Sequence, residues 1–124
     1  MPIATSQRTV IDCSDPGLLA RFYGALLDWE VRVKDDRTWA GVWSRDEQHS
    51  LRFQRVAQYQ APSWPEGEPG QQMHIDLHVD DLDVAEAAVL ALDPPPTKAA
   101  FQPGEAYRVF LDPSGHPFCL TTSR

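Results

Sequence analysis

The sequence is poor in basic residues and has no long hydrophobic runs. Its 124 residues hold 11 Lys and Arg against 18 Asp and Glu, which gives a formal net charge of −7. Without a basic cluster, the chain is a poor candidate for binding nucleic acid or an anionic membrane. The apolar runs are too short for a bilayer, and the N-terminus MPIATSQRTV has no basic segment followed by an apolar one. We therefore expect neither a membrane span nor a signal peptide.

Cysteine is also scarce, and the sequence contains two, Cys13 and Cys119. Two cysteines are too few for a disulfide framework, so we expect the protein in a reducing cytoplasm. What the chain does contain is 42% hydrophobic residues and four Trp, which favours a globular protein with its own core. Its length is that of one ordinary domain, residues 1–124.

A repeat with an offset of 66 residues organises the chain. The segment RTVIDCSDPGLLARFYGALL aligns with HIDLHVDDLDVAEAAVLAL. Both place apolar residues at i, i+1, i+4, i+5 and i+8, which is the buried stripe of an amphipathic helix. Ser14 or Asp15 can cap the first predicted helix, and Asp81 or Asp83 the second. An apolar, strand-like segment precedes each helix.

Three further strand-like segments follow each predicted helix. They are WEVRV, TWAGVWS and SLRFQRV in the first half, and TKAAF, YRVFL and PFCLTT in the second. Residues 57–72, rich in Pro, Gly and Gln, are typical of a linker. The sequence thus predicts two βαβββ repeats, residues 6–56 and 73–123. A unit this short cannot bury its own sheet face, so the repeats must pack together or swap with a partner chain.

The doubled pattern and the segments DCSDPGLLARFYGALLDWEV, HIDLHVDDLDVAEAAV and FLDPSGHPFCL resemble the vicinal oxygen chelate superfamily. That superfamily contains glyoxalase I, bleomycin-resistance proteins and extradiol dioxygenases. The stretch SWPEGEPGQQMHIDLHVDDL is similar to small bacterial glyoxalase-like proteins. The resemblance covers nearly the whole chain and implies an α+β fold, with two βαβββ modules forming a curled, mostly antiparallel sheet and the helices outside. Because this fold hosts lyases, dioxygenases, epimerases and binding proteins, it leaves the activity open.

The resemblance also implies which residues line a cavity inside the curled sheet. In metal-using members, four ligands come from the first and last strands of each half and are usually His, Gln or Glu. The matching positions here are Arg8, Gln54, His74 and Cys119, with Arg52 on the same strand face as Gln54. Arginine stays protonated and cannot ligate, which leaves at most His74, Gln54 and Cys119 for a metal. We therefore expect no cofactor and an incomplete metal site.

The segment MHIDLHVDD places His74, Asp76 and His78 on one face of a predicted strand. His74 and His78 would lie about 13 Å apart along an extended chain, too far to share one ion. Side chains at i and i+2 lie about 7 Å apart, so we expect Asp76 to orient His74 only from a neighbouring position. This polar face is best interpreted as the floor of a binding cavity, with Asp76 either a solvated or Arg-paired carboxylate or a general base.

Aromatic residues are the other candidates for the cavity. Trp39 and Trp43 alternate around Gly41, a pattern that suits either core packing or stacking on a flat ligand. Trp64 in the linker suits a lid or a dimer interface. Cys119 is either a small buried core residue or, with an activating neighbour, a thiolate.

The leading functional interpretation is a protein that binds a small organic molecule in the sheet cavity. The planar, permanently charged guanidinium of Arg8 would suit a carboxylate or phosphate on that molecule. One alternative is a divalent-metal lyase or dioxygenase, and another is a purely structural dimer module with a filled cavity. Whether a reaction is catalysed stays open. Because short two-module chains of this superfamily usually pair, we expect a homodimer.

Overall fold

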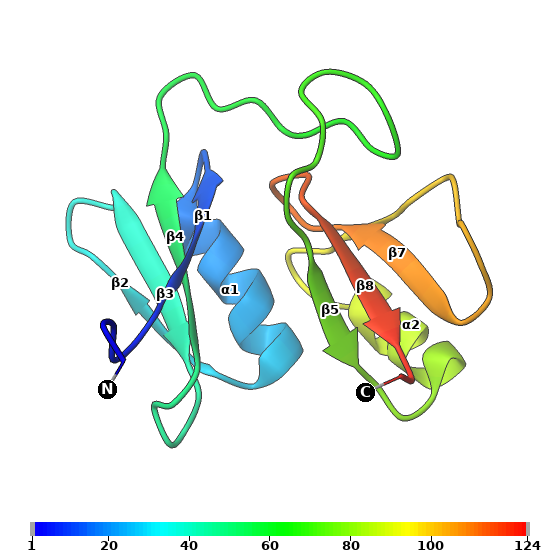
Figure 1. The fold of residues 1–124 in the computed structure, drawn as a ribbon, viewed down its shortest axis with the longest axis horizontal. Helices are drawn as coiled ribbons and strands as arrows, with labels where there is room; N and C mark the ends of the chain where they lie inside the picture. Colours follow the sequence, from blue (N-terminus) through cyan, green and yellow to red (C-terminus); the bar gives the residue numbers. More distant parts are fainter. Residues whose placement is uncertain (1, 124) are drawn as a thin grey trace. The chain divides into compact units, whose positions relative to one another are not determined.

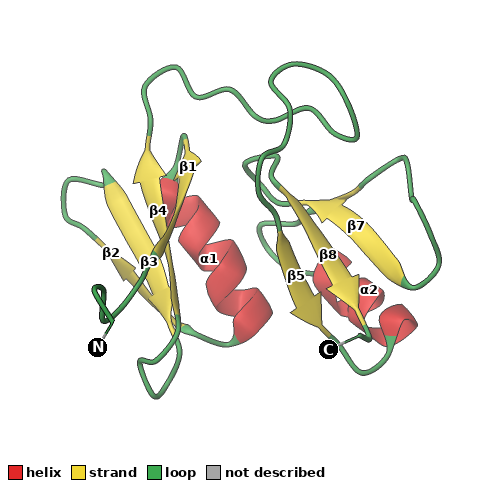
Figure 2. Ribbon diagram, viewed as in Figure 1, coloured by secondary structure: helices red, strands yellow, loops and turns green. Residues whose placement is uncertain are grey.

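The computed structural model describes residues 2–123, which form two compact units (Figure 1). The first unit, here called module 1, ends at Tyr59, and module 2 begins at Gln60. Each module contains one helix and one open four-stranded sheet, in the chain order β-α-β-β-β (Figure 2). The predicted α+β class and the two βαβββ repeats are confirmed.

Module 1 has a helix on one face of its sheet. Its elements are β1 (Thr9–Cys13), α1 (Pro16–Leu27), β2 (Glu30–Val33), β3 (Trp39–Trp43) and β4 (Ser50–Arg55). The strand order is β1-β4-β3-β2, with β1 parallel to β4 and the other two pairs antiparallel. Tyr23 of α1 stacks on Phe53 of β4, with ring centroids 5.5 Å apart, and both side chains are fully buried. Because successive strand residues point to opposite faces, the residues between the core positions form a second, open face.

Module 2 repeats this arrangement. Its elements are β5 (Ile75–His78), α2 (Leu82–Leu90), β6 (Thr97–Lys98), β7 (Tyr107–Leu111) and β8 (Pro117–Thr121). The strand order is β5-β8-β7-β6, again with one parallel pair, β5 and β8, and two antiparallel pairs. Phe110 and Phe118 stack at 5.6 Å in its core.

Local sequence signals explain where the helices begin and where the last hairpin turns. Asp15 accepts a hydrogen bond from the backbone N–H of Leu18, and Asp81 accepts one from that of Val84. Of the residues predicted as possible caps, Asp15 therefore caps α1 and Asp81 caps α2. In the turn DPSG between β7 and β8, the Asp112 carboxylate accepts from the N–H of Ser114, and Gly115 takes a φ of +86°. A side chain would be strained at that φ, which explains the glycine.

The strand β6 is shorter than the segment TKAAF suggested. After Lys98 one backbone hydrogen bond remains, from the Ala99 N–H to the Val109 carbonyl, and the Gln102 side chain makes further hydrogen bonds in place of a longer strand. Its amide nitrogen donates to the carbonyls of Ala99 and Val109, and its oxygen accepts from the Val109 N–H. A polar side chain thus replaces backbone pairing at this edge, which the apolar pattern of the segment could not reveal.

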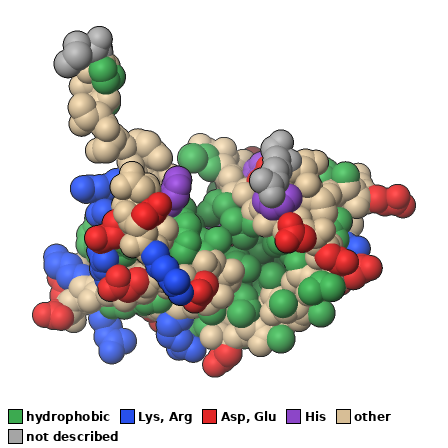
Figure 3. All heavy atoms as spheres, turned by 90° about the horizontal axis from the view of Figure 1, so that it is seen from below, with side chains coloured by type: hydrophobic (Ala, Val, Ile, Leu, Met, Phe, Trp, Pro, Cys, Tyr) green, Lys and Arg blue, Asp and Glu red, His purple; other side chains and the backbone are tan. Residues whose placement is uncertain are grey.

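Hydrophobic side chains also reach the surface of the protein, between acidic and basic ones (Figure 3). In module 1 they include Val31 and Val33 of β2, and in module 2 Val84 of α2 and Phe101. Neither helix of residues 2–123 combines the length and the apolar character that crossing a membrane requires.

The N-cap of α2 gives a direct test of this fold. We expect Asp81→Ala to lower the free energy of unfolding by about 1 kcal/mol, because the Val84 N–H loses its acceptor. Asp81→Asn keeps a capping oxygen and should cost much less. Urea denaturation measures both, with Asp80→Ala, an exposed neighbour outside the cap, as the control. Equal losses for Asp81→Ala and Asp80→Ala would contradict the assignment.

Candidate functional site

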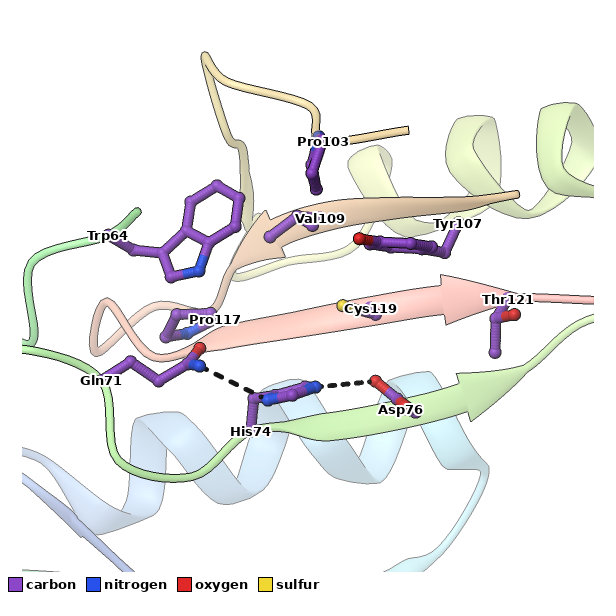
Figure 4. A pocket seen from close by; sticks show the side chains of 10 residues that line it. All are labelled: Trp64, Gln71, His74, Asp76, Pro103, Tyr107, Val109, Pro117, Cys119 and Thr121. Atoms are coloured by element: carbon purple, nitrogen blue, oxygen red, sulfur yellow. Dashed lines mark hydrogen bonds and ion pairs between the residues drawn. The ribbon is translucent and has the colours of Figure 1, made fainter. Parts of the chain in front are cut away.

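The open face of the module 2 sheet carries a pocket of about 260 Å³ (Figure 4). Its walls come from β5, β7, β8 and the irregular segments beside them. The lining residues are Trp64, Gln71, His74, Asp76, Pro103, Tyr107, Val109, Pro117, Cys119 and Thr121. Within the strands they occupy every second position, as expected for one face of a sheet.

Strand register brings the polar residues of this pocket together. In the parallel pair of β5 and β8, Asp76 lies opposite Cys119. In the antiparallel pair of β7 and β8, Val109 lies opposite Cys119 and Tyr107 opposite Thr121. Residues more than 40 positions apart in the sequence, such as Asp76 and Cys119, therefore share the pocket floor.

A continuous chain of hydrogen bonds runs along this floor. The Gln71 amide nitrogen lies 3.4 Å from Nδ1 of His74, and Nε2 of His74 lies 3.1 Å from the Asp76 carboxylate (Figure 4). The Cys119 thiol hydrogen-bonds the same carboxylate. A carboxylate only accepts, so Nε2 of a neutral His74 carries the proton and Nδ1 accepts from Gln71. Each polar group of the chain thus has a partner without any bound ion.

The direct contact of His74 with Asp76 corrects the expectation that Asp76 could act on His74 only from a neighbouring position. That expectation assumed an extended strand through both residues. His74 instead precedes the first residue of β5, Ile75, and its ring leans along the chain toward the carboxylate. His78 forms a separate contact with Asp80, at 3.5 Å, and does not line the pocket.

The environment of Cys119 keeps its thiol protonated. Burial, together with the charge and the hydrogen bond of Asp76, raises the pKa of Cys119 to about 11. A thiolate is the reactive form of cysteine, and an activated thiolate needs the opposite environment, with a nearby positive charge. Of the two interpretations of Cys119, the geometry favours the neutral, hydrogen-bonding floor residue.

Aromatic side chains form the wall above this floor. Trp64 and Tyr107 pack against a small cluster of Ala99, Val109 and Cys119. Trp64 thus contributes to the pocket of its own module. Gln71 and Tyr107 also line the pocket, although no sequence pattern pointed to them. The alternation in YRVFL places Tyr107 and Val109 on the same strand face, but it does not show which face of the sheet is open.

The other predicted residues lie on the open face of module 1. Arg8 is exposed just before β1, and Gln54 of β4 is half-buried opposite Trp39. Trp43 lies beside two guanidinium groups, those of Arg32 and Arg52. The structure therefore brings together three of the predicted site residues in module 2, His74, Asp76 and Cys119, and places the remainder in module 1.

All helices and strands of both modules, and the residues of the pocket, fall within a match to a known family. A family model described as a glyoxalase-like domain matches residues 8–121. The chain belongs to this family. The resemblance to the vicinal oxygen chelate superfamily is thereby confirmed. A search of curated proteins found no match to this glyoxalase-like domain.

Solved structures share the fold of this glyoxalase-like domain at low sequence identity. The fosfomycin resistance protein FosX from Mesorhizobium loti is 16% identical, with a TM-score of 0.66 over 100% of this chain and 94% of its own. FosX from Listeria monocytogenes is 12% identical, with a TM-score of 0.68 over 99% and 94%. A glyoxalase family protein from Enterococcus faecalis is 21% identical, with a TM-score of 0.59 over 96% and 98%. At these identities the likeness concerns the fold.

A divalent metal ion is the cofactor that the superfamily implies, and three side chains of the module 2 pocket offer donor atoms for one. One donor atom from each of His74, Asp76 and Cys119 lies within 4.8 Å of the others. Imidazole, carboxylate and thiolate are zinc ligands. In this arrangement, however, both His74 nitrogens have partners and the thiol is protonated. An ion would have to displace at least one hydrogen bond and the Cys119 proton, so the fit is partial.

The raised pKa of Cys119 predicts how the thiol reacts. We expect iodoacetamide to modify Cys119 slowly at pH 8 and faster as the pH rises toward 11, because the thiolate fraction increases. Asp76→Asn removes the negative charge that opposes ionisation, so it should lower the pKa and speed modification at pH 8. Mass spectrometry of the Cys119 peptide measures the rate.

Asp80→Asn, which removes an exposed carboxylate of the same module outside the pocket, is the control and should leave the rate unchanged. A wild-type rate that already levels off at or below pH 9 would contradict the assignment.

Proposed function

We propose that this glyoxalase-like domain binds a small organic molecule in the pocket of module 2, without a tightly held metal ion. The observation that carries the proposal is the hydrogen-bond chain through His74, Asp76 and Cys119, which needs no ion to complete it. Above it, Trp64 and Tyr107 supply apolar wall. Apolar walls with a few convergent polar groups are typical of small-molecule sites.

The polar floor suits a ligand with a hydroxyl or carbonyl group. When His74 releases Gln71 or Asp76, its ring can donate or accept a hydrogen bond, and the Thr121 hydroxyl on the same face can do either. The raised thiol pKa argues against Cys119 as a nucleophile at neutral pH. The proposed role is therefore binding, as expected from the sequence.

A ligand panel with a matched pair of His variants tests this function. We expect some small organic molecules to raise the melting temperature of the protein in a saturable way, since binding to the folded state stabilises it. His74→Gln should weaken the binding about fivefold or more, because one hydrogen bond of about 1 kcal/mol is lost. His78→Gln, at the last residue of the adjoining strand β5 and outside the pocket, is the control. No response to the panel, or equal loss in both variants, would refute the proposal.

The alternative is a divalent-metal lyase or dioxygenase, and the convergence of His74, Asp76 and Cys119 favours it. The Cys119 thiol, whose pKa is raised to about 11 by burial and by Asp76, must lose its proton before it ligates, which opposes metal binding. Dialysis of untagged protein against zinc, nickel, manganese or iron, followed by metal analysis, should therefore leave far less than one ion per chain. Retention of nearly one metal ion per chain, lost in His74→Ala but kept in His78→Ala, would favour the metal-dependent enzyme over the metal-free binding protein.

A homodimer in the cytoplasm remains the proposed state of the protein. The exposed apolar side chains of module 1, such as Val10, Val31 and Val33, support a surface that a partner covers. The scarcity of cysteine supports a reducing compartment. Light scattering at micromolar concentration should give twice the mass of the 13.9 kDa chain, and a monomer would count against pairing.

A further inference from the structure

One arginine on the open face of module 1, Arg52, has no polar partner among residues 2–123. Arg52 of β4 is half-buried, and its Nε has no contact with solvent and no hydrogen-bond acceptor. Among residues 2–123, no carboxylate forms an ion pair with it. Its close contact is the ring of Trp43, whose centroid lies 4.8 Å from Cζ of Arg52. A guanidinium held in this way loses part of its hydration without an opposite charge in return.

The indole of Trp43 fixes the position of this guanidinium. Arg32, Gly41 and Arg52 lie side by side on β2, β3 and β4. A Cβ on Gly41 would lie 2.8 Å from Cζ3 and Cη2 of Trp43, so the glycine makes the room in which the ring sits. The Arg32 guanidinium also lies over the ring, 4.4 Å from its centroid. Trp43 and Gly41 are therefore positioning residues for the arginine beside them.

The charges of the two stacked arginines are balanced differently. Arg32 has two ion pairs, with Glu30 at 3.0 Å and Glu47 at 2.7 Å, so its charge is compensated. Arg52 has none, and burial with the charges of Arg8 and Arg32 lowers its pKa. The exposed Arg8 likewise forms no ion pair among residues 2–123. Two neighbouring arginines thus lack counter-charges in a chain whose acidic residues outnumber its basic ones 18 to 11.

We propose that Arg52 and Arg8 bind the oxyanion group of a small molecule, a carboxylate or a phosphate, on the open face of module 1. Cζ of Arg52 lies over the Trp43 ring, and the terminal N–H groups of a planar guanidinium can donate to two oxygens of an oxyanion at once. Because Nε of Arg52 is buried, the two Nη groups are the donors. The proposal concerns module 1 and does not depend on the pocket of module 2.

Anion titration followed by nuclear magnetic resonance tests the site. Sodium phosphate and sodium benzoate are titrated separately at constant ionic strength, with sodium chloride as the balancing salt. The indole N–H signal of Trp43, identified by its loss in Trp43→Phe, should shift in a saturable way with at least one of the two anions. A response to phosphate alone assigns the oxyanion as phosphate, and a response to benzoate alone assigns it as carboxylate.

Variants separate a built site from general attraction to positive charge. Arg52→Gln and Arg8→Gln should each weaken binding about tenfold or more, because each removes a charge-assisted hydrogen bond. Arg52→Lys keeps the charge but loses the fork, and Gly41→Ala displaces the ring without a change of charge, so both should also weaken it. Arg45→Gln, which removes a fully exposed arginine of the same module, is the matched control and should stay within twofold.

The proposal is overturned if neither anion gives a saturable shift. It is also overturned if Arg45→Gln weakens binding as much as Arg8→Gln does, since the attraction would then be general. The exposed position of Arg8 makes its variant safe for folding, so Arg8→Gln decides the question even if Arg52→Gln does not fold.

Discussion

The parallel pairing of the first and last strand of each module, β1 with β4 and β5 with β8, is the constraint on which the rest of the structure depends. It places the strand that precedes the helix directly beside the last strand of the same repeat. The helix between them covers one sheet face and supplies apolar side chains to it. The opposite face has no helix of its own module, and the candidate sites of both modules lie there.

The two open faces solve the problem of polar groups in different ways. In module 2, Gln71, His74, Asp76 and Cys119 satisfy one another, and the cost of partial burial is offset by hydrogen bonds. In module 1, Arg52 is held by an aromatic ring and faces the charge of Arg8 without an acidic partner. A satisfied network favours a neutral polar ligand, whereas an unbalanced pair of cations favours an anion. The repeat thus provides one scaffold with two different surface chemistries.

The superfamily resemblance predicted four cavity residues, and the structure places two of them in each module. They are Arg8, Gln54, His74 and Cys119. His74 and Cys119 line the same pocket because the parallel pairing of β5 with β8 sets Asp76, two residues after His74, opposite Cys119. Arg8 and Gln54 belong to module 1, Arg8 just before β1 and Gln54 within β4. In the same module, Arg52 has a buried Nε that forms no hydrogen bond. Arg52 was visible in the sequence as a neighbour of Gln54, but nothing in a period-two pattern distinguishes a solvated arginine from one stacked on an indole. That distinction comes from Gly41 and Trp43 across the strand pair.

The sequence by itself determined the two βαβββ repeats and most strand positions, and it narrowed each helix cap to two residues, of which Asp15 and Asp81 are the caps in the structure. These features depend on local periodicity and on backbone preferences, which neighbouring residues carry. Only the tertiary structure decided that His74 contacts Asp76, that this carboxylate raises the pKa of Cys119, and that Arg52 lacks a partner. The first depends on the rotamers of two residues that lie two positions apart in the chain. The other two depend on burial and on the pairing of separate strands, which no local pattern specifies.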